Sequence, residues 1–491
     1  MFMSNYFYKH STPFSIAIKD NQSILCLRVC FHIFVLVEYI SRSNICRYGF
    51  PNLNKLFSTL VSSFLSLFVA SSLVAREFSH HEPGVARLNN GSFGSPPQCV
   101  LSNQAMWAQQ WLQHPDAFCW EPLEKGFAAA RQQLADLIHS PNVNEIVLLE
   151  NATTGAGVVA LDVMWSFLER RYEKGDSILM FNSAYGAIKK VFKGYCFRAG
   201  ARLFEYKMPF PVSSNQEILQ SFEDALRREK KENPSKVIRL AVIDHIVSMP
   251  SIILPIRELV QLCRAYGVEQ IFVDAAHAIG NVDVNVQEID ADYYVSNLHK
   301  WLFAPPVVAF FHCKPQHLSQ LHHPLVSNNY GLGLVGESYW VGTRDYSAFL
   351  AVPAAIKFVN DTAGDIKSYR DYNHRKVVEM AQMLVSAWGT HLGAPPELFG
   401  SMAMVGLPAS LNIHSPEDAL RMRTRLRTEF QVEVPLYYPA EGVDEIFSDH
   451  RHSTTKTSSV AYARISHQIY NKLEEYHMLR DAVQAIAAES T

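Results

Sequence analysis

Lys300 and Asp274 are the residues whose types and positions point most directly to covalent chemistry. Lys300 lies in the run Ser296-Asn-Leu-His-Lys300-Trp, just after the apolar segment 293–295, and Asp274 ends the apolar segment 271–274. A lysine amine can form a Schiff base with an aldehyde, and a carboxylate can keep a pyridine nitrogen protonated so that the ring accepts electrons. The pair therefore predicts an enzyme that uses pyridoxal 5′-phosphate (PLP).

PLP catalysis also needs groups that bind the phosphate, stack on the ring and hold the substrate carboxylate. The sequence offers a candidate for each. The run Asn151-Ala-Thr-Thr-Gly155 follows an apolar segment and would open a helix whose free N–H groups suit a phosphate. Tyr185 offers a flat ring for stacking. Arg464 offers a guanidinium fork for a substrate carboxylate. Each residue alone has a commoner structural role, so the prediction rests on their order and spacing taken together.

The elements that must position these residues alternate along the chain from about residue 77. Apolar strands are predicted at 146–149, 178–181, 201–206, 237–243, 271–273, 293–295 and 307–311, and helices at 121–138, 216–231, 253–266 and 369–390. This alternation predicts an α/β fold with a mostly parallel sheet and helices on both of its faces. Ligands of such sheets bind at the carboxyl ends of the strands, where the candidate residues stand.

Three regions are expected: an N-terminal extension (1–76), a large PLP-binding domain that includes an N-terminal arm (77–352), and a smaller C-terminal α+β domain (353–491). The extension holds seven Lys and Arg but only two acids, and its segment 56–75 is uncharged and long enough to cross a bilayer. It could be a targeting presequence, a membrane anchor, or an extension without a functional role. A polar stretch at 441–459 is expected to be a loop.

The composition excludes some functions. A net charge of −3 leaves no basic surplus for a phosphate backbone, so nucleic acid is not an expected partner. The eight cysteines include no C-x-x-C pair, and no metal site is expected. Their wide spacing is typical of reduced, intracellular protein, in a plastid, a mitochondrion or the cytoplasm.

At this point the motifs resemble a known family. The matching runs are 88–94, 151–155, 184–187, 244–250, 272–277, 296–301, 342–347 and 464–471. Together they resemble the class V aminotransferase family of fold type I PLP enzymes. Within it they are most similar to the plant L-cysteine desulfhydrases, which are related to isopenicillin N epimerase. The resemblance covers the chain from about residue 77 to its end.

The resemblance implies a role for each matching residue. Lys300 would hold PLP and move the α-proton, Asp274 would bond the pyridine nitrogen, His277 would lie by the ring hydroxyl, and Tyr185 would stack on the ring. Residues expected at the phosphate are Ala152, Thr153, Asn297 and His299. Thr343 would reach the phosphate of a neighbouring subunit's cofactor, so a homodimer is expected.

Arg464 and Asn90 would contact the substrate. Ser248 stands, with Val247, where relatives often place an asparagine near the ring hydroxyl, and Asn90 replaces a histidine that is common in relatives. The implied reaction is α,β-elimination of L-cysteine to hydrogen sulfide, ammonia and pyruvate. The alternatives are a cysteine desulfurase, an aminotransferase or epimerase, and a membrane-tethered protein without catalysis.

The positions of the cysteines separate the first two of these reactions. A desulfurase needs a mobile thiolate near the substrate carboxylate. The last cysteine is Cys313, and Cys196 and Cys263 lie in apolar runs that predict a core. Only Cys99 and Cys119 could lie near the pocket, so we expect direct release of sulfide without an enzyme-bound persulfide.

Overall fold

The computed structural model describes residues 72–439 and 460–489. Residues Val74–Thr491 make up one compact unit. Residues 1–71 of the predicted N-terminal extension, with most of its apolar segment 56–75, and the predicted loop at 441–459 lie outside the described residues. Within the part that is described, no helix is both long and apolar enough to span a membrane.

A seven-stranded sheet forms the centre of this unit, with the strand order β2-β8-β7-β6-β5-β3-β4. Strand β8 runs antiparallel to both of its neighbours, and the remaining pairs are parallel. The strands are β2 (Ile146–Leu149), β3 (Ser177–Phe181), β4 (Arg202–Tyr206), β5 (Ile238–Asp244), β6 (Gln270–Asp274), β7 (Tyr293–Asn297) and β8 (Ala309–Cys313). The predicted α/β fold with a mostly parallel sheet is confirmed.

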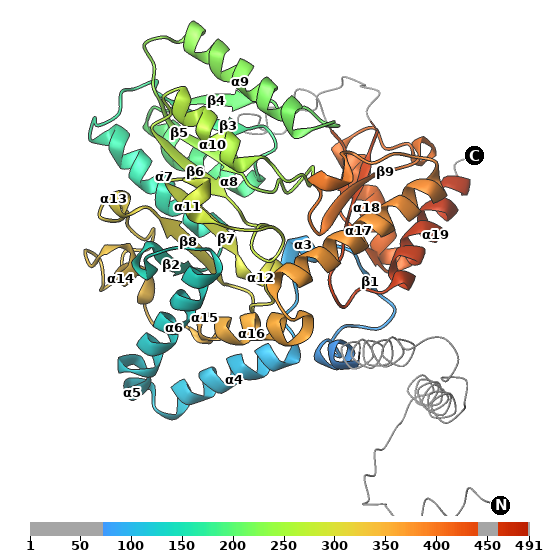
Figure 1. The fold of residues 1–491 in the computed structure, drawn as a ribbon, viewed down its shortest axis with the longest axis horizontal. Helices are drawn as coiled ribbons and strands as arrows, with labels where there is room; N and C mark the ends of the chain where they lie inside the picture. The colour runs from blue at the N-terminus through green and yellow to red at the C-terminus, as the bar shows by residue number, and fades with distance from the viewer. Residues whose placement is uncertain (1–71, 440–459, 490–491) are drawn as a thin grey trace, which may run out of the picture. The chain divides into compact units, whose positions relative to one another are not determined.

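Both faces of this sheet are covered by helices (Figure 1). Along β3, Ile178 and Met180 pack against α7 and α8, whereas Leu179 and Phe181 belong to the core on the opposite face. Because successive side chains of a strand point to opposite faces, a strand that is apolar at every position must be buried on both. The covering helices are α6 (Pro122–Leu137), α7 (Ala152–Leu168), α8 (Gly186–Phe192), α9 (Asn215–Glu232) and α10 (Ile256–Ala265).

The C-terminal region is a smaller α+β arrangement, as expected. Its antiparallel sheet has the order β11-β12-β9 and packs with α17, the longest helix described. The elements are α17 (Ile366–Trp388), β9 (Met402–Gly406), α18 (Pro416–Phe430), β10 (Val432–Glu433), β11 (Leu436–Tyr437), β12 (Tyr462–Ser466) and α19 (Leu473–Glu489). The domain boundary at 352/353 stays a prediction.

The N-terminal arm joins the two regions. Its strand β1 (Ala86–Arg87) pairs with β10 of the C-terminal region, and its helix α3 (Asn90–Phe93) lies against α12 (Leu298–Trp301). The remaining helices are α4 (Gln98–Gln113), α5 (Pro115–Trp120), α11 (Val286–Ile289), α13 (Pro315–Leu318), α14 (Gly333–Tyr339), α15 (Ser347–Leu350) and α16 (Val352–Ala363).

Two boundaries differ from the sequence prediction for identifiable backbone reasons. The helix predicted at 253–266 begins only at Ile256, because Pro255 precedes it and Ile253 forms a β-bridge with Ile246. The strand predicted from 307 begins at Ala309, because Val307 has a φ of 74° that interrupts an extended chain.

Candidate active site

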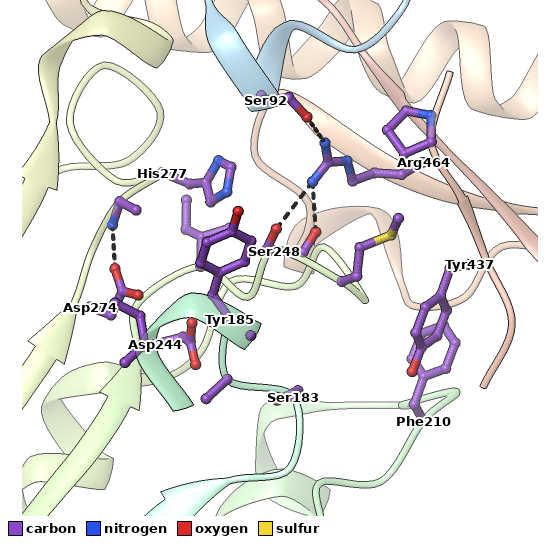
Figure 2. Close-up of a pocket in the computed structure, with 18 of the residues that line it drawn as sticks. Ser92, Ser183, Tyr185, Phe210, Asp244, Ser248, Asp274, His277, Tyr437 and Arg464 are labelled. Atoms are coloured by element: carbon purple, nitrogen blue, oxygen red, sulfur yellow. Dashed lines mark hydrogen bonds between the residues drawn. The ribbon is translucent and has the colours of Figure 1, made fainter. Parts of the chain in front are cut away.

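A pocket of about 1750 Å³ opens at the carboxyl ends of β3, β5, β6 and β7 (Figure 2). The N-terminal arm and β12 complete its wall. Ten of the twelve residues predicted for the site line it: Ala152, Thr153, Tyr185, Ser248, Asp274, His277, Asn297, His299, Lys300 and Arg464. Asn90 and Thr343 do not.

Lys300 stands on α12, a single helical turn that directly follows β7. Burial and the nearby positive charge of Arg464 lower the pKa of Lys300 to about 8, although the Asp274 and Asp244 carboxylates oppose this shift. An amine with this pKa is neutral in a useful fraction of molecules near neutral pH, and only the neutral amine is a nucleophile or a base.

His277 contacts Lys300 directly. The Trp301 indole N–H donates to Nδ1 of His277 at 3.4 Å, so the neutral imidazole carries its proton on Nε2. That nitrogen lies 3.3 Å from Nζ of Lys300. Burial, followed by the charges of Lys300 and Arg464, lowers the pKa of His277 well below its usual range, so the ring is neutral.

Asp274 is the buried carboxyl at the end of β6, with 4% of its surface exposed. Its Oδ1 accepts a hydrogen bond from the backbone N–H of Ala276 at 3.0 Å. Among the described residues it forms no ion pair, and burial raises its pKa. The charge of Lys300 opposes this shift without forming an ion pair, so the carboxyl group remains open to a cationic partner in the pocket.

The start of α7 faces the same pocket with backbone donors. The Asn151 side chain caps this helix by accepting the N–H of Thr154 at 2.9 Å, and Asn297 Oδ1 accepts the N–H of Ala152 at 2.9 Å. A Cβ atom at Gly155 would come within 2.8 Å of Val295, so glycine lets the helix lie close to the sheet. The helix start is thereby held rigidly at the pocket.

His299 contributes a ring nitrogen to the pocket, and Tyr185 contributes a flat aromatic ring. The Nδ1–H of His299 donates to the Val308 carbonyl at 3.2 Å, which leaves Nε2 for a ligand. Burial and then the Lys300 charge lower the pKa of His299 to about 4. Tyr185 keeps 53% of its surface exposed although it lines the pocket, and Figure 2 shows its ring projecting into it.

Arg464, on β12, is a buried cation whose partners are all neutral. Its Nη1 donates to the Ser248 carbonyl at 2.9 Å and to Ser248 Oγ at 3.3 Å, and its Nη2 donates to Asn89 Oδ1 at 2.8 Å and Ser92 Oγ at 3.1 Å. Only 3% of the residue is exposed, and no carboxylate pairs with it among the described residues. A buried charge without an opposite charge is suited to binding an anion.

Sequence reasoning missed the neutral residues that orient Arg464 and one acid at a strand end. Asn89 and Ser92 belong to the Gly-Ser-Phe-Gly region, but the fold that brings them to Arg464 spans more than 370 positions of sequence separation. Asp244 lines the pocket at the end of β5. Its position after an apolar strand is the same signal that identified Asp274.

The two remaining predicted residues stand elsewhere in the single chain. The Asn90 amide donates to Asn471 at 2.7 Å and accepts from the Tyr470 hydroxyl at 2.8 Å, so its side chain is engaged beside the pocket wall. Thr343 is exposed, outside the pocket lining. A substrate contact for Asn90 and a cofactor contact for Thr343 stay predictions.

None of the described cysteines lines the candidate active-site pocket. Cys196 and Cys263 are buried in the core, as predicted, as is Cys313. Cys99 and Cys119 are more accessible, but neither lines the pocket. Partial desolvation and the adjacent Glu77 raise the pKa of the Cys99 thiol to about 12, which removes the thiolate that sulfur transfer requires.

Comparisons with known proteins agree with this geometry. Residues 120–404 match the family model of the class V aminotransferases. The chain is 47% identical to an L-cysteine desulfhydrase of Arabidopsis thaliana over 87% of this chain and 93% of the relative. It is 28% identical to isopenicillin N epimerase of Streptomyces clavuligerus over 83% of this chain and 96% of the epimerase.

A solved structure shares the fold at low sequence identity. The C-DES variant with glycine covalently linked to its PLP cofactor superposes with a TM-score of 0.64 and 16% identity, covering 84% of this chain and 98% of that one. The fold is therefore that of the fold type I PLP enzymes. The chain belongs to the class V aminotransferase family.

PLP is the cofactor of this chain, and the pocket residues fit it. Asp274 is a buried carboxyl without an ion pair, the start of α7 presents the N–H of Thr153, Tyr185 exposes a ring inside the pocket, and Lys300 has a weakly basic amine. These features match the pyridine nitrogen, the phosphate, the ring face and the aldehyde of PLP.

Proposed function

We propose that this chain is a PLP-dependent carbon–sulfur lyase that converts L-cysteine into hydrogen sulfide, ammonia and pyruvate. The observation that carries the proposal is the convergence of Lys300, Asp274 and the unpaired cation Arg464 on one pocket, and the described residues that line it include no cysteine. The identity to a relative named L-cysteine desulfhydrase supports the choice of substrate.

Each residue has a defined task in this proposal. When bound, PLP supplies an aldehyde that bonds to amines and a protonated ring that draws electrons from the substrate Cα. Asp274 holds the proton of the ring nitrogen, and Tyr185 supports the ring face. The Thr153 N–H and the side-chain N–H groups of Asn297 are the donors for the phosphate, and Ala152 and His299 line the pocket beside them. His299 can donate from Nε2 only when its ring is charged.

The substrate is oriented by Arg464, whose guanidinium binds the α-carboxylate while Ser248, Asn89 and Ser92 fix its direction. The neutral amine of Lys300 then takes the proton from Cα. Loss of that proton allows the Cβ–S bond to break, and the electron pair leaves with sulfur as thiolate. The remaining three-carbon enamine hydrolyses in water to pyruvate and ammonia.

The neutral His277 keeps Lys300 in place without competing for the proton. Because the pKa of His277 lies well below its usual range, the imidazole does not become charged beside the amine. When Lys300 is neutral, its Nζ can accept the Nε2–H of His277 across 3.3 Å. The ring hydroxyl of the cofactor is a second partner that the resemblance implies for this histidine.

Lys300→Arg tests the central assignment. Arginine keeps the positive charge and most of the volume but cannot form a Schiff base, so we expect loss of the visible absorbance of lysine-bound PLP and of sulfide release. Lys314→Arg, at a surface ion pair with Asp290, is the matched control and should leave both unchanged. Full sulfide release by Lys300→Arg would contradict the assignment.

We also propose a homodimer in which Thr343 reaches the partner's cofactor. Thr343 is exposed, and the loop before α14 exposes four large apolar residues: Leu325, Val326, Tyr330 and Leu332. An exposed apolar surface of this kind is typical of an interface. Sedimentation analysis should give twice the mass of one chain, and a monomer at working concentration would contradict the proposal. The compartment, whether plastid, mitochondrion or cytoplasm, stays a prediction.

A further inference from the structure

A second buried carboxyl group, Asp244, stands beside Asp274. The two residues end the neighbouring parallel strands β5 and β6 and are paired in register. Their exposed fractions are 3% and 4%, and both line the pocket. Figure 2 shows the two carboxyl groups close to each other on the left of the view, beside Tyr185. Paired residues of adjacent strands point to the same face, so two acids share one buried corner.

The hydrogen bonds of the two acids are unequal. Asp274 Oδ1 accepts the backbone N–H of Ala276 at 3.0 Å. Asp244 Oδ2 is fully buried and has no hydrogen-bond partner among the described residues. A hydrogen bond donated to a carboxylate stabilises its charge, whereas an unpartnered buried oxygen favours the neutral form. Of the two, Asp274 is therefore the better site for the charge and Asp244 the better site for a proton.

The charges around Asp244 act in both directions. Burial and then the charge of Asp274 raise the pKa of Asp244 well above its usual range. The charge of Lys189 on α8, a hydrogen bond from the backbone N–H of Asp244 itself and the charge of Lys300 on α12 oppose them. The net direction is set by burial and by the second acid, and it agrees with the unpartnered Oδ2 of Asp244.

We propose that Asp244 is a positioning residue that keeps its proton at neutral pH and thereby lets Asp274 carry the negative charge beside it. Two adjacent buried carboxylates cannot both ionise without a large repulsion, so the pair holds one proton and one charge. A single negative charge matches the single positive charge of a protonated pyridine ring. The inference rests on the cofactor role given to Asp274 under the proposed function.

Infrared spectroscopy of the holoenzyme tests where the proton resides. Asp244→Asn has the size of the protonated acid and no carboxyl group. The difference spectrum of wild type minus Asp244→Asn at neutral pH should contain the C=O band of a protonated carboxyl, and the band should shift when aspartate carries a ¹³C-labelled carboxyl. Absence of this band would mean that Asp244 is ionised, for instance as a partner of Lys189, and would overturn the proposal.

Asp292→Asn is the matched control for a buried acid that is ionised. Although burial opposes the shift, hydrogen bonds from His317 at 3.1 Å and Arg264 at 2.6 Å lower the pKa of Asp292. Wild type minus Asp292→Asn should therefore lack the protonated-carboxyl band. A band in this control equal to the band in the Asp244 difference would show that the signal does not report on Asp244, and would also overturn the assignment.

A second measurement is the pH titration of the visible absorbance of bound PLP in wild type and Asp244→Asn. Removal of a negative charge beside Lys300 would move the pH midpoint of the visible absorbance of bound PLP to lower pH, because the positive form loses a stabilising neighbour. Removal of a neutral acid would leave the midpoint in place. We expect Asp244→Asn to titrate like wild type, and a clear downward shift would contradict a protonated Asp244. Neither readout needs sulfide release, so failure of the lyase function and failure of this inference are distinguishable.

Discussion

At the scale of single residues, the role proposed for Lys300 depends on the basicity of its amine. The amine must be neutral to attack an aldehyde. Because burial and Arg464 lower its pKa from 10.5 to about 8, roughly a tenth of the molecules carry a neutral amine at neutral pH. An ordinary surface lysine would be neutral in far fewer molecules, so the pocket prepares this amine for Schiff-base formation.

This basicity predicts a pH dependence for cofactor attachment. A lysine with a lowered pKa loses its proton as the pH rises, so the rate at which PLP bonds to the apoenzyme should increase up to a pH of about 8 and then level off. Stopped-flow absorbance measures this rate. Arg464→Gln removes a charge that lowers the pKa of Lys300 and should move the profile to higher pH. A wild-type rate that keeps rising to the usual lysine pKa of 10.5 would contradict the assignment.

At the scale of elements, the strand ends that carry the chemistry could be predicted from the sequence because the signal is local. Asp274 and Lys300 each follow a short apolar strand, and the structure places both at the same edge of the sheet. Two predicted boundaries are wrong because the backbone conformation there does not follow from the apolar pattern of the side chains. Pro255 delays a helix, and Val307 adopts a left-handed conformation that its residue type does not suggest.

Contacts between distant segments could not be predicted in this way. The environment of Arg464 depends on Asn89 and Ser92 from the opposite end of the chain. The role of Asp244 depends on the register between β5 and β6, which fixes its distance from Asp274. Hydrophobic periodicity within one segment does not identify the distant segment that the first one contacts. The expectation that these motifs meet at one site therefore came from the resemblance to a family.

The approach of the N-terminal arm to α12 leads to a prediction about Gly94. Its φ is 66°, and an added Cβ would collide with the His299 carbonyl and lie 3.0 Å from Cα of Lys300. Gly94→Ala should lower the free energy of unfolding by at least about 1 kcal/mol and weaken PLP binding, because the arm or α12 must move. Thermal unfolding and PLP titration measure the two effects.

Gly84→Ala is the control for backbone strain alone. Gly84 has a φ of 81°, but no atom lies within 4 Å of an added Cβ. This variant should lose stability through strain and yet bind PLP like wild type. Equal PLP affinity in the Gly94 and Gly84 variants would show that the close approach to α12 has no consequence for the site.

At the scale of the whole molecule, the pocket depends on segments from nearly the full length of the described chain. The N-terminal arm, the carboxyl ends of four central strands and β12 each contribute to its wall. The strand pair β1–β10 connects the arm with the C-terminal region. The residues proposed to bind the cofactor and those proposed to bind the substrate therefore form one site only when both regions are folded.

The positions of the described thiols favour a lyase over a desulfurase. The accessible thiols of Cys99 and Cys119 lie outside the pocket lining, and their pKa values are raised by partial desolvation and by the neighbouring acids Glu77 and Asp116. Neither is suited to attack a substrate sulfur as a thiolate. Sulfur should therefore leave as free sulfide.

Product analysis with L-cysteine tests this central claim most directly. Sulfide, pyruvate and alanine are measured together for the wild-type enzyme and for the double variant Cys99→Ser/Cys119→Ser. We predict equal amounts of sulfide and pyruvate, no alanine, and little change in the double variant, because elimination needs Lys300 and no protein thiol. Alanine in place of pyruvate, or a persulfide on either cysteine that turnover requires, would contradict the account.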